Sequence, residues 1–144
     1  MKYKNIFISF TLLFCLGFLI YKVDSRSDTK INICGRNLYV DISDSTLERK
    51  QGLSGREYIG ESEGMLFMFE RPQIAGFWMK DMLFPIDIIW INEDMEIVGV
   101  EREVSPETFP KVFYSGVPIK YVLEANSGFF ELNKCSISDK LEVF

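Results

Sequence analysis

Three charged side chains, Lys80, Asp81 and Asp87, interrupt the otherwise apolar stretch FWMKDMLFPIDIIWI at residues 77–91. Successive side chains of a strand alternate between its two faces, so Trp78 and Lys80 would share one face. An aromatic ring beside a cation there could form a shelf for a ligand. Asp87 would share its face with isoleucines, and a buried carboxylate without a partner is costly. The stretch therefore predicts either a binding site or a structural ion pair.

Glu124 poses the same problem, because it stands near the end of the apolar run KYVLEA. In the structural interpretation, Lys80 and Asp87 interact within one partly buried network that also includes an arginine or Glu124. In the functional interpretation, Asp87 and Glu124 form the acid/base pair of a hydrolase or transferase. The sequence leaves both open, and the cations available to a network are Lys80, Arg49, Arg56 and Arg71.

The chain contains no histidine, which excludes several kinds of catalytic site and makes a transition-metal site less expected. Catalysis of the Ser-His-Asp and Cys-His types lacks its base, and transition metals lack their commonest nitrogen ligand. A Ser–Lys nucleophile built from Lys80 with Ser54 or Ser115 has no supporting spacing. The turn residues Asp41, Asp44 and Asp94 also lack the dense ligand spacing of a calcium loop. We therefore expect no metal and no cofactor.

Composition indicates one globular domain once any targeting segment is removed. Of the 144 residues, 47% are apolar and 26% are charged, which is typical of a chain with one hydrophobic core. Acidic residues outnumber basic ones by 21 to 16. Nucleic-acid binding needs a basic surface, so nucleic acid is not an expected partner.

The N-terminus has the pattern of a targeting segment. The basic start MKYKN is followed by sixteen uncharged and mostly apolar residues at positions 6–21. This run is longer than a usual signal-peptide core and marginal for a bilayer span. Residues 1–25 are therefore predicted to be a signal peptide or an uncleaved membrane anchor. Either one places the rest of the chain outside the cytoplasm, in the periplasm, in the cell envelope or tethered to the membrane.

Two cysteines, Cys34 and Cys135, lie near the two ends of the predicted exported part, while Cys15 falls in the apolar segment. Two thiols in an oxidising compartment favour one disulfide. The alternative is a pair of unpaired buried thiols, because pairing cannot be deduced from sequence alone.

The elements that must position these residues are short. Residues 26–35 are predicted to be a linker leading into a single β-rich domain at 36–144, and a short helix follows the capping box of Ser45 and Glu48 and stops at Gly52. A helical turn is expected at 127–134 and a long ordered loop at 105–118. Strands are expected at 36–43, 63–70, 76–80, 85–91, 95–104, 120–125 and 140–144. The pattern predicts a mainly β (α+β) fold, either a compact β-sandwich or a partly closed barrel with one or two short helices.

The ordered segments ERKQGLSGR, EGMLFMF, FWMKDMLFPIDIIWI and YVLEANSG resemble the domain-of-unknown-function 192 family over residues 36–143. The resemblance implies a compact β-rich fold with short helices, and it implies no established activity. This chain departs from the family pattern at Ser54, Asp81, Met82 and Met95. The matching positions are Glu48, Arg49, Gly52, Leu53, Arg56, Gly64, Met65, Leu66, Phe67, Phe69, Trp78, Met79, Lys80, Pro85, Asp87, Leu123, Glu124 and Gly128.

The leading functional hypothesis is a noncatalytic binding module of the cell envelope. Its partner would be an unknown small polar molecule or a segment of an envelope protein. One alternative is a carboxylate-based hydrolase or transferase acting on an envelope substrate. A second alternative is a structural domain without a ligand. The candidate ligand-binding residues are Arg56, Trp78, Lys80, Asp87 and Glu124.

Overall fold

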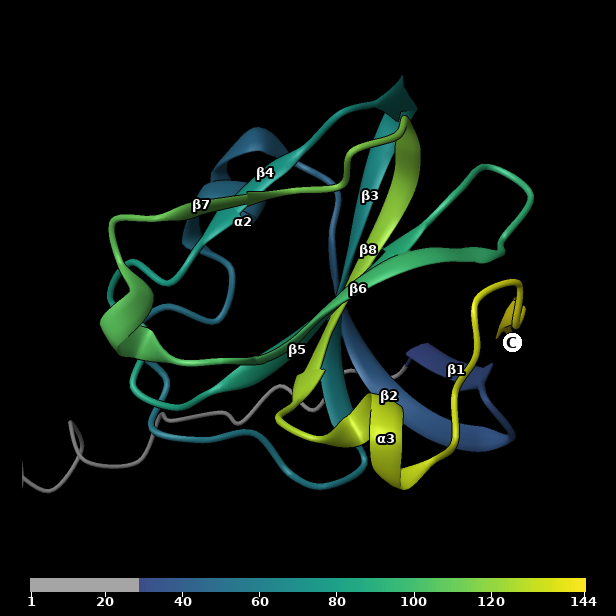
Figure 1. Cartoon of the computed structure of the whole chain (residues 1–144), viewed down its shortest axis with the longest axis horizontal. Coiled ribbons are helices and arrows are strands. Elements are labelled where there is room, and N and C mark those ends of the chain that lie inside the picture. Colours follow the sequence, from purple (N-terminus) through teal and green to yellow (C-terminus); the bar gives the residue numbers. More distant parts are fainter. Residues whose placement is uncertain (1–28) are drawn as a thin grey trace, which may run out of the picture.

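The computed structural model describes residues 29–144 and shows a strongly curled, half-barrel sheet with two short helices (Figure 1). The seven-stranded sheet has the order β6-β5-β8-β3-β2-β1-β9, and β4 and β7 form a separate two-stranded ribbon. The expected mainly β fold is confirmed, in its partly closed barrel form. The strands are β1 (Thr29–Ile33), β2 (Arg36–Ser43), β3 (Glu63–Gln73), β4 (Gly76–Trp78), β5 (Ile86–Ile91), β6 (Ile97–Val104), β7 (Val112–Tyr114), β8 (Ile119–Asn126) and β9 (Leu141–Val143).

The two helices are α2 (Thr46–Gln51) and α3 (Phe129–Leu132), and a 3-10 turn spans Pro106–Thr108. Helix α2 connects β2 to the parallel strand β3, and α3 follows β8. Within residues 29–144, no helix is long and apolar enough to cross a bilayer. The predicted targeting segment at residues 1–25 lies outside the described residues.

Central strands of the sheet are buried on both faces, which explains the continuous apolar runs in the sequence. All six residues of β5 are buried, and one face carries Ile89 and Ile91 while the other carries Ile88 and Trp90. Each face belongs to its own hydrophobic cluster. The sheet thus divides the core into two compartments, and a one-residue step along a strand moves a side chain from one compartment to the other.

Two strands lie where the sequence predicted none. β1 begins at Thr29, inside the predicted linker. Only Ile31 and Ile33 of this strand are fully buried, so its alternation of apolar and polar residues is too short to give a clear strand pattern. A two-residue turn at Cys34 and Gly35, with positive φ values of 53° and 72°, joins β1 to β2. Positive φ at both positions is typical of tight hairpin turns, and glycine adopts it without strain. β7 lies inside the predicted loop at 105–118 and pairs with β4.

The open side of the half-barrel is bridged at one end. Glu96 pairs with Lys140 in an isolated antiparallel bridge, and their side chains form an ion pair with an N–O distance of 3.5 Å. The amide of Leu141 donates to the carbonyl of Met95 at 2.8 Å. These contacts connect the turn before β6 to the C-terminal segment. They enclose, at that end, the hydrophobic cluster that contains Ile89 and Ile91.

Candidate ligand-binding cavity

Helix α2 forms one side of the candidate site, and local sequence signals fix both of its ends. The Ser45 side chain accepts from the amide of Glu48, and the Glu48 carboxylate accepts from the amide of Ser45, as the capping box predicts. Hydrogen bonds from Ser45 lower the pKa of Glu48. The helix ends at Gly52, whose N–H donates to the Glu48 carbonyl at 2.8 Å.

Gly52 is required by its backbone conformation, and it lies beside the floor of the site. Its φ is +52°, which side chains rarely adopt. A Cβ at this position would lie 3.4 Å from the ring of Phe67 and 4.0 Å from Oε2 of Glu124. These are ordinary van der Waals distances, so they place the end of α2 against the floor of the site without themselves requiring glycine.

The turn after α2 is attached to the segment that follows β4. The amide of Gly55 donates to the carbonyl of Asp81 at 2.8 Å, and the Ser54 hydroxyl donates to the carbonyl of Lys80 at 2.8 Å. These two bonds hold the wall formed by α2 against the wall formed by β4.

Between these walls lies a cavity of about 330 Å³, here called the Glu124 cavity. Aromatic rings form much of its lining, and the rings of Phe67 and Phe77 meet edge to face with centroids 4.8 Å apart. The ring of Phe77 also packs against the buried ring of Trp90, with centroids 5.5 Å apart, and this contact helps to fix the orientation of the Phe77 ring. The lining residues are Arg49, Lys50, Gln51, Gly52, Leu53, Ser54, Phe67, Phe69, Gln73, Ile74, Ala75, Gly76, Phe77, Trp78, Met82 and Glu124.

Among residues 29–144, Glu124 is the only acidic residue of this lining, and it is only 5% exposed. Its Oε2 atom is buried and has no hydrogen-bond partner among residues 29–144. Burial raises the pKa of its carboxyl group from 4.5 to about 8, and the positive charge of Arg56 opposes this shift only in part. The group is therefore mostly protonated at neutral pH, and it can donate one hydrogen bond as well as accept others.

Arg49 is held at the edge of the cavity by the backbone. Its guanidinium donates to the carbonyl of Asp44 and to the carbonyl of Met68, the latter at 3.0 Å. It also lies over the ring of Phe69, 5.3 Å from the centroid. These contacts place a fixed positive charge at the cavity edge.

A second hollow of about 720 Å³ continues from the Glu124 cavity along α2. Both hollows are lined by Lys50, Gln51, Ser54 and Trp78, so they meet at these residues. Lys80 and Asp81 line the second hollow only.

The structure brings together some of the five predicted site residues and separates others. Trp78 and Glu124 line the same cavity, and Lys80 lies in the adjoining hollow. Arg56 forms an ion pair with Asp41 at 2.7 Å and lines neither hollow, although its charge reaches Glu124.

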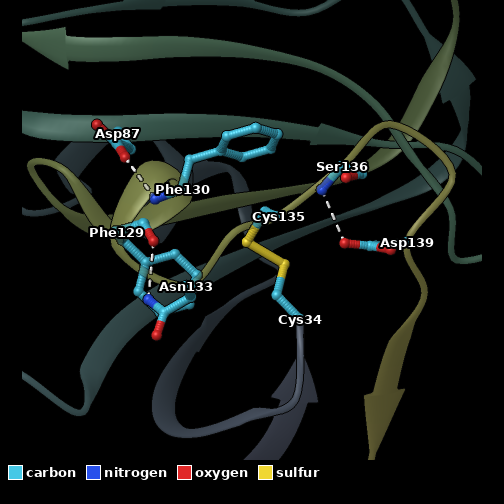
Figure 2. The surroundings of a disulfide bond; sticks show 8 residues. All are labelled: Cys34, Asp87, Phe129, Phe130, Asn133, Cys135, Ser136 and Asp139. Carbon is cyan, nitrogen blue, oxygen red and sulfur yellow. Dashed lines mark hydrogen bonds between the residues drawn. A yellow bond between two sulfur atoms is a disulfide. The ribbon is translucent and has the colours of Figure 1, made fainter.

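Asp87 lies outside both hollows and has a closed set of partners. Its carboxylate accepts from the amides of Glu103 at 2.8 Å, Gly128 at 3.1 Å and Phe130 at 2.9 Å. The last contact is shown in Figure 2. Because the amides of Gly128 and Phe130 belong to the first turn of α3, Asp87 caps this helix from a distant strand.

The predicted network of Lys80 and Asp87 is therefore wrong. Lys80 is exposed, and no ion pair within residues 29–144 joins it to Asp87. A buried carboxylate can be satisfied by backbone amides as well as by a cation, and Asp87 has three such amides.

The acid/base pair of Asp87 and Glu124 is also not formed. In the register of β5 and β8, Ile88 stands opposite Glu124 and Asp87 stands opposite Ala125. Residues directly opposite share a face, so the two carboxyl groups point to opposite sides of the sheet.

Cys34 and Cys135 form a disulfide with a Cα–Cα distance of 5.2 Å, which confirms the predicted pairing. Figure 2 shows that the bond lies beside α3, which Asp87 holds at its other end. In the described part of the chain, no three histidine, cysteine or acidic side chains are grouped as a metal site would need.

Several lining residues were missed as site residues, notably Arg49, Gly52, Phe67 and Phe77. The aromatic residues gave no separate signal, because a phenylalanine that lines a cavity has the same strand pattern as one that fills the core. Gly52 was predicted only as the stop of α2, and a helix-ending glycine gives no signal for a neighbouring cavity.

Comparisons with known proteins agree with this architecture. The family model DUF192, described as "Uncharacterized ACR", matches residues 29–143. No curated protein shows a matching sequence. A crystal structure of a protein of unknown function from Novosphingobium aromaticivorans is similar with a TM-score of 0.75 and 26% identity, over 78% of this chain and 83% of that one.

A second similar crystal structure is that of a proposed transcription regulator from Sinorhizobium meliloti. Its TM-score is 0.76 with 28% identity, and the match covers 82% of this chain and 95% of that one. With a family match that spans all but the last residue of the described chain, this protein belongs to the domain-of-unknown-function 192 family.

Proposed function

We propose that this protein is a noncatalytic binding module of the cell envelope that holds a small polar ligand in the Glu124 cavity. The observation that carries the proposal is the buried Oε2 atom of Glu124, which has no partner among residues 29–144. Leaving such a group unsatisfied costs about 1–3 kcal/mol, so nearly all buried polar groups in proteins are paired. A ligand that hydrogen-bonds to Glu124 would supply the missing partner.

The cavity has the composition of a small-molecule site. Such sites are concave, mostly apolar and supplied with a few polar groups that orient the ligand. Here Phe67 and Phe77 supply the apolar surface, and Glu124 supplies the polar group at the floor. A volume of about 330 Å³ favours a small molecule, or a single side chain of a protein segment that continues into the second hollow.

Two observations support a location outside the cytoplasm. The basic and apolar pattern of residues 1–25 is typical of an export segment or anchor. Cys34 and Cys135 form a disulfide, and disulfides form and persist in oxidising compartments.

The alternatives receive less support. A carboxylate-based hydrolase or transferase would have to rely on Glu124 alone, because Asp87 lies on the opposite face of the sheet. A purely structural role fits Asp87 and the Arg56–Asp41 pair but leaves the Glu124 cavity unexplained. A role in transcription, as proposed for the Sinorhizobium protein, would need a nucleic-acid surface, and the net charge of −5 opposes one.

A thermal-shift screen of small polar molecules on the purified full-length protein tests the proposal. Hits should lose their shift in Trp78→Ala, which removes a cavity wall, and in Ala75→Leu, which fills the buried end. Tyr114→Ala is the matched control, because Tyr114 is an exposed aromatic residue of the same ribbon that lines neither hollow. A screen without hits, or hits that Trp78→Ala leaves unchanged, would reject the Glu124 cavity as the binding site.

A further inference from the structure

We infer that the small polar ligand of the Glu124 cavity is a monocarboxylic acid with a compact apolar body, bound as its carboxylate through a hydrogen bond donated by the Glu124 carboxyl group. This inference rests on the proposed function and names the chemical class of its ligand. It is carried by the size of the cavity, by the charges around it and by the position of Glu124.

Size limits the ligand to one ring or a short branched chain with a polar group. A dry cavity of about 150 Å³ can hold benzene, so about 330 Å³ leaves room for a ring and one substituent. Apart from Glu124, the buried part of the lining consists of Leu53, Phe67, Ala75 and Met82, whose side chains are apolar. The polar group of the ligand must therefore meet Glu124 or lie at the mouth.

Within the described part of the chain, the charged residues that line the cavity are positive apart from Glu124. Arg49 and Lys50 lie on α2 at its edge, and Arg56 on the following turn acts on Glu124 through its charge. Inside the Glu124 cavity an anion is thus favoured over an ammonium group, while Glu48 and Asp81 share the adjoining hollow with Lys50 and Lys80.

The neighbouring strands place no second acid directly beside Glu124. Met65 of β3 and Ile88 of β5 stand directly opposite it on its two sides. The acids in the same cross-strand row are Asp41, which pairs with Arg56, and Glu101. Each lies two strands from Glu124, or about 9–10 Å at the usual strand spacing.

The protonation state of Glu124 decides which ligand it accepts. A neutral carboxyl group donates its O–H, and a bond from O–H to a carboxylate oxygen is charge-assisted and stronger than a neutral one. A neutral amide would gain hydrogen bonds without the charge assistance. An amine would need Glu124 to lose its proton first. Of these three classes, the carboxylate fits both the proton and the surrounding charges.

This assignment makes binding depend on pH in a defined direction. Because the pKa of Glu124 is about 8, the donor is present below that pH and is lost above it. Ionised Glu124 would repel a carboxylate, so affinity should fall by up to about tenfold per pH unit above the titration.

The test uses three probes that share one ring, namely benzoate, benzamide and benzylamine, titrated calorimetrically into the full-length protein at pH 6.5 and 9.5. Benzoate should bind most tightly at pH 6.5 and at least about tenfold more weakly at pH 9.5. In Glu124→Gln, the amide N–H replaces the donor without titrating, so benzoate should bind equally at both pH values. Lys50→Gln should weaken benzoate without changing benzamide, and Ala75→Leu should abolish binding of benzoate.

Tighter binding of benzamide or benzylamine than of benzoate at pH 6.5 would overturn the inference. If Ala75→Leu still removed that binding, the proposed function would stand with a different ligand class. A benzoate affinity that does not change between the two pH values in the wild type, or an absence of benzoate binding, would also overturn it. The proposed function itself falls only if the wider screen finds nothing that depends on Trp78.

Discussion

Asp87 and Glu124 are buried carboxyl groups on adjacent strands, one residue out of register, and they point to opposite faces of the same sheet. Their environments differ accordingly. Asp87 accepts three backbone hydrogen bonds, whereas the buried oxygen of Glu124 has no partner within the described residues. The first carboxylate is therefore built into the fold, and the second faces a cavity.

Asp87→Ala should destabilise the protein by about 3 kcal/mol. The substitution leaves three backbone amides without an acceptor, and each buried unsatisfied group carries a cost of about 1–3 kcal/mol that local rearrangement reduces. Asp87→Asn should cost less, because its carbonyl oxygen keeps part of the acceptor capacity. Denaturant unfolding under oxidising conditions measures both changes.

Lys80→Met is the control for this experiment, and it should change stability by less than about 0.5 kcal/mol because Lys80 is exposed. The double mutant should show additive effects. Coupling above about 0.5 kcal/mol between the two sites would mean that Lys80 contributes to holding Asp87 after all.

Glu124→Gln should remove a pH dependence of stability that the wild type shows. Burial raises the pKa of Glu124 in the folded state to about 8, above its ordinary value of 4.5, so the folded protein binds the extra proton in this interval. The contribution of Glu124 to the free energy of unfolding therefore falls by about 1.4 kcal/mol per pH unit as pH rises from about 4.5 to about 8. Outside this interval its contribution is constant.

The quantity to follow is the difference in unfolding free energy between wild type and Glu124→Gln from pH 4 to 9. Other carboxylates contribute equally to both proteins and cancel in this difference. The unfolding free energy of the wild type, relative to that of Glu124→Gln, should fall steadily between about pH 4.5 and 8. A flat difference would show that Glu124 titrates normally, which would also remove the donor on which carboxylate binding depends.

Replacing both Cys34 and Cys135 by serine should lower stability by about 4–5 kcal/mol. The disulfide spans 101 residues, and in the chain-entropy model a loop of that length gains this much from closure. Mass spectrometry of the unreduced protein should find the two cysteines linked. Losing less than about 1 kcal/mol in the double variant would mean that the unfolded chain is hardly constrained by the bond.

The sequence was informative where one local signal determines one local structure. The capping box of Ser45 and Glu48 predicted α2, and the apolar run at 85–91 predicted β5, because each pattern has few other solutions. β1 and β7 were missed, since strands of five and three residues gain their stability from neighbours rather than from their own composition.

The candidate site was harder to predict, because it depends on which face of a strand a residue occupies and on what meets it there. Trp78 and Glu124 were identified from residue type, but the same reasoning also selected Asp87. Nothing in the sequence distinguishes a carboxylate that meets amides of α3 from one that meets a cavity. That difference follows from the strand register and from the distant connection of α3.

Residues 1–25 should direct the domain out of the cytoplasm. The basic start and the sixteen-residue uncharged run that follows it are typical of export segments, and the disulfide between Cys34 and Cys135 would form after transfer to an oxidising compartment. Alkaline phosphatase is active only when exported, so a fusion placed after Lys30 should be active. The matched control is the same fusion without residues 2–21, which should be expressed but inactive. A well-expressed fusion after Lys30 that shows no activity would place the domain in the cytoplasm, and the envelope part of the proposed function would then have to be abandoned.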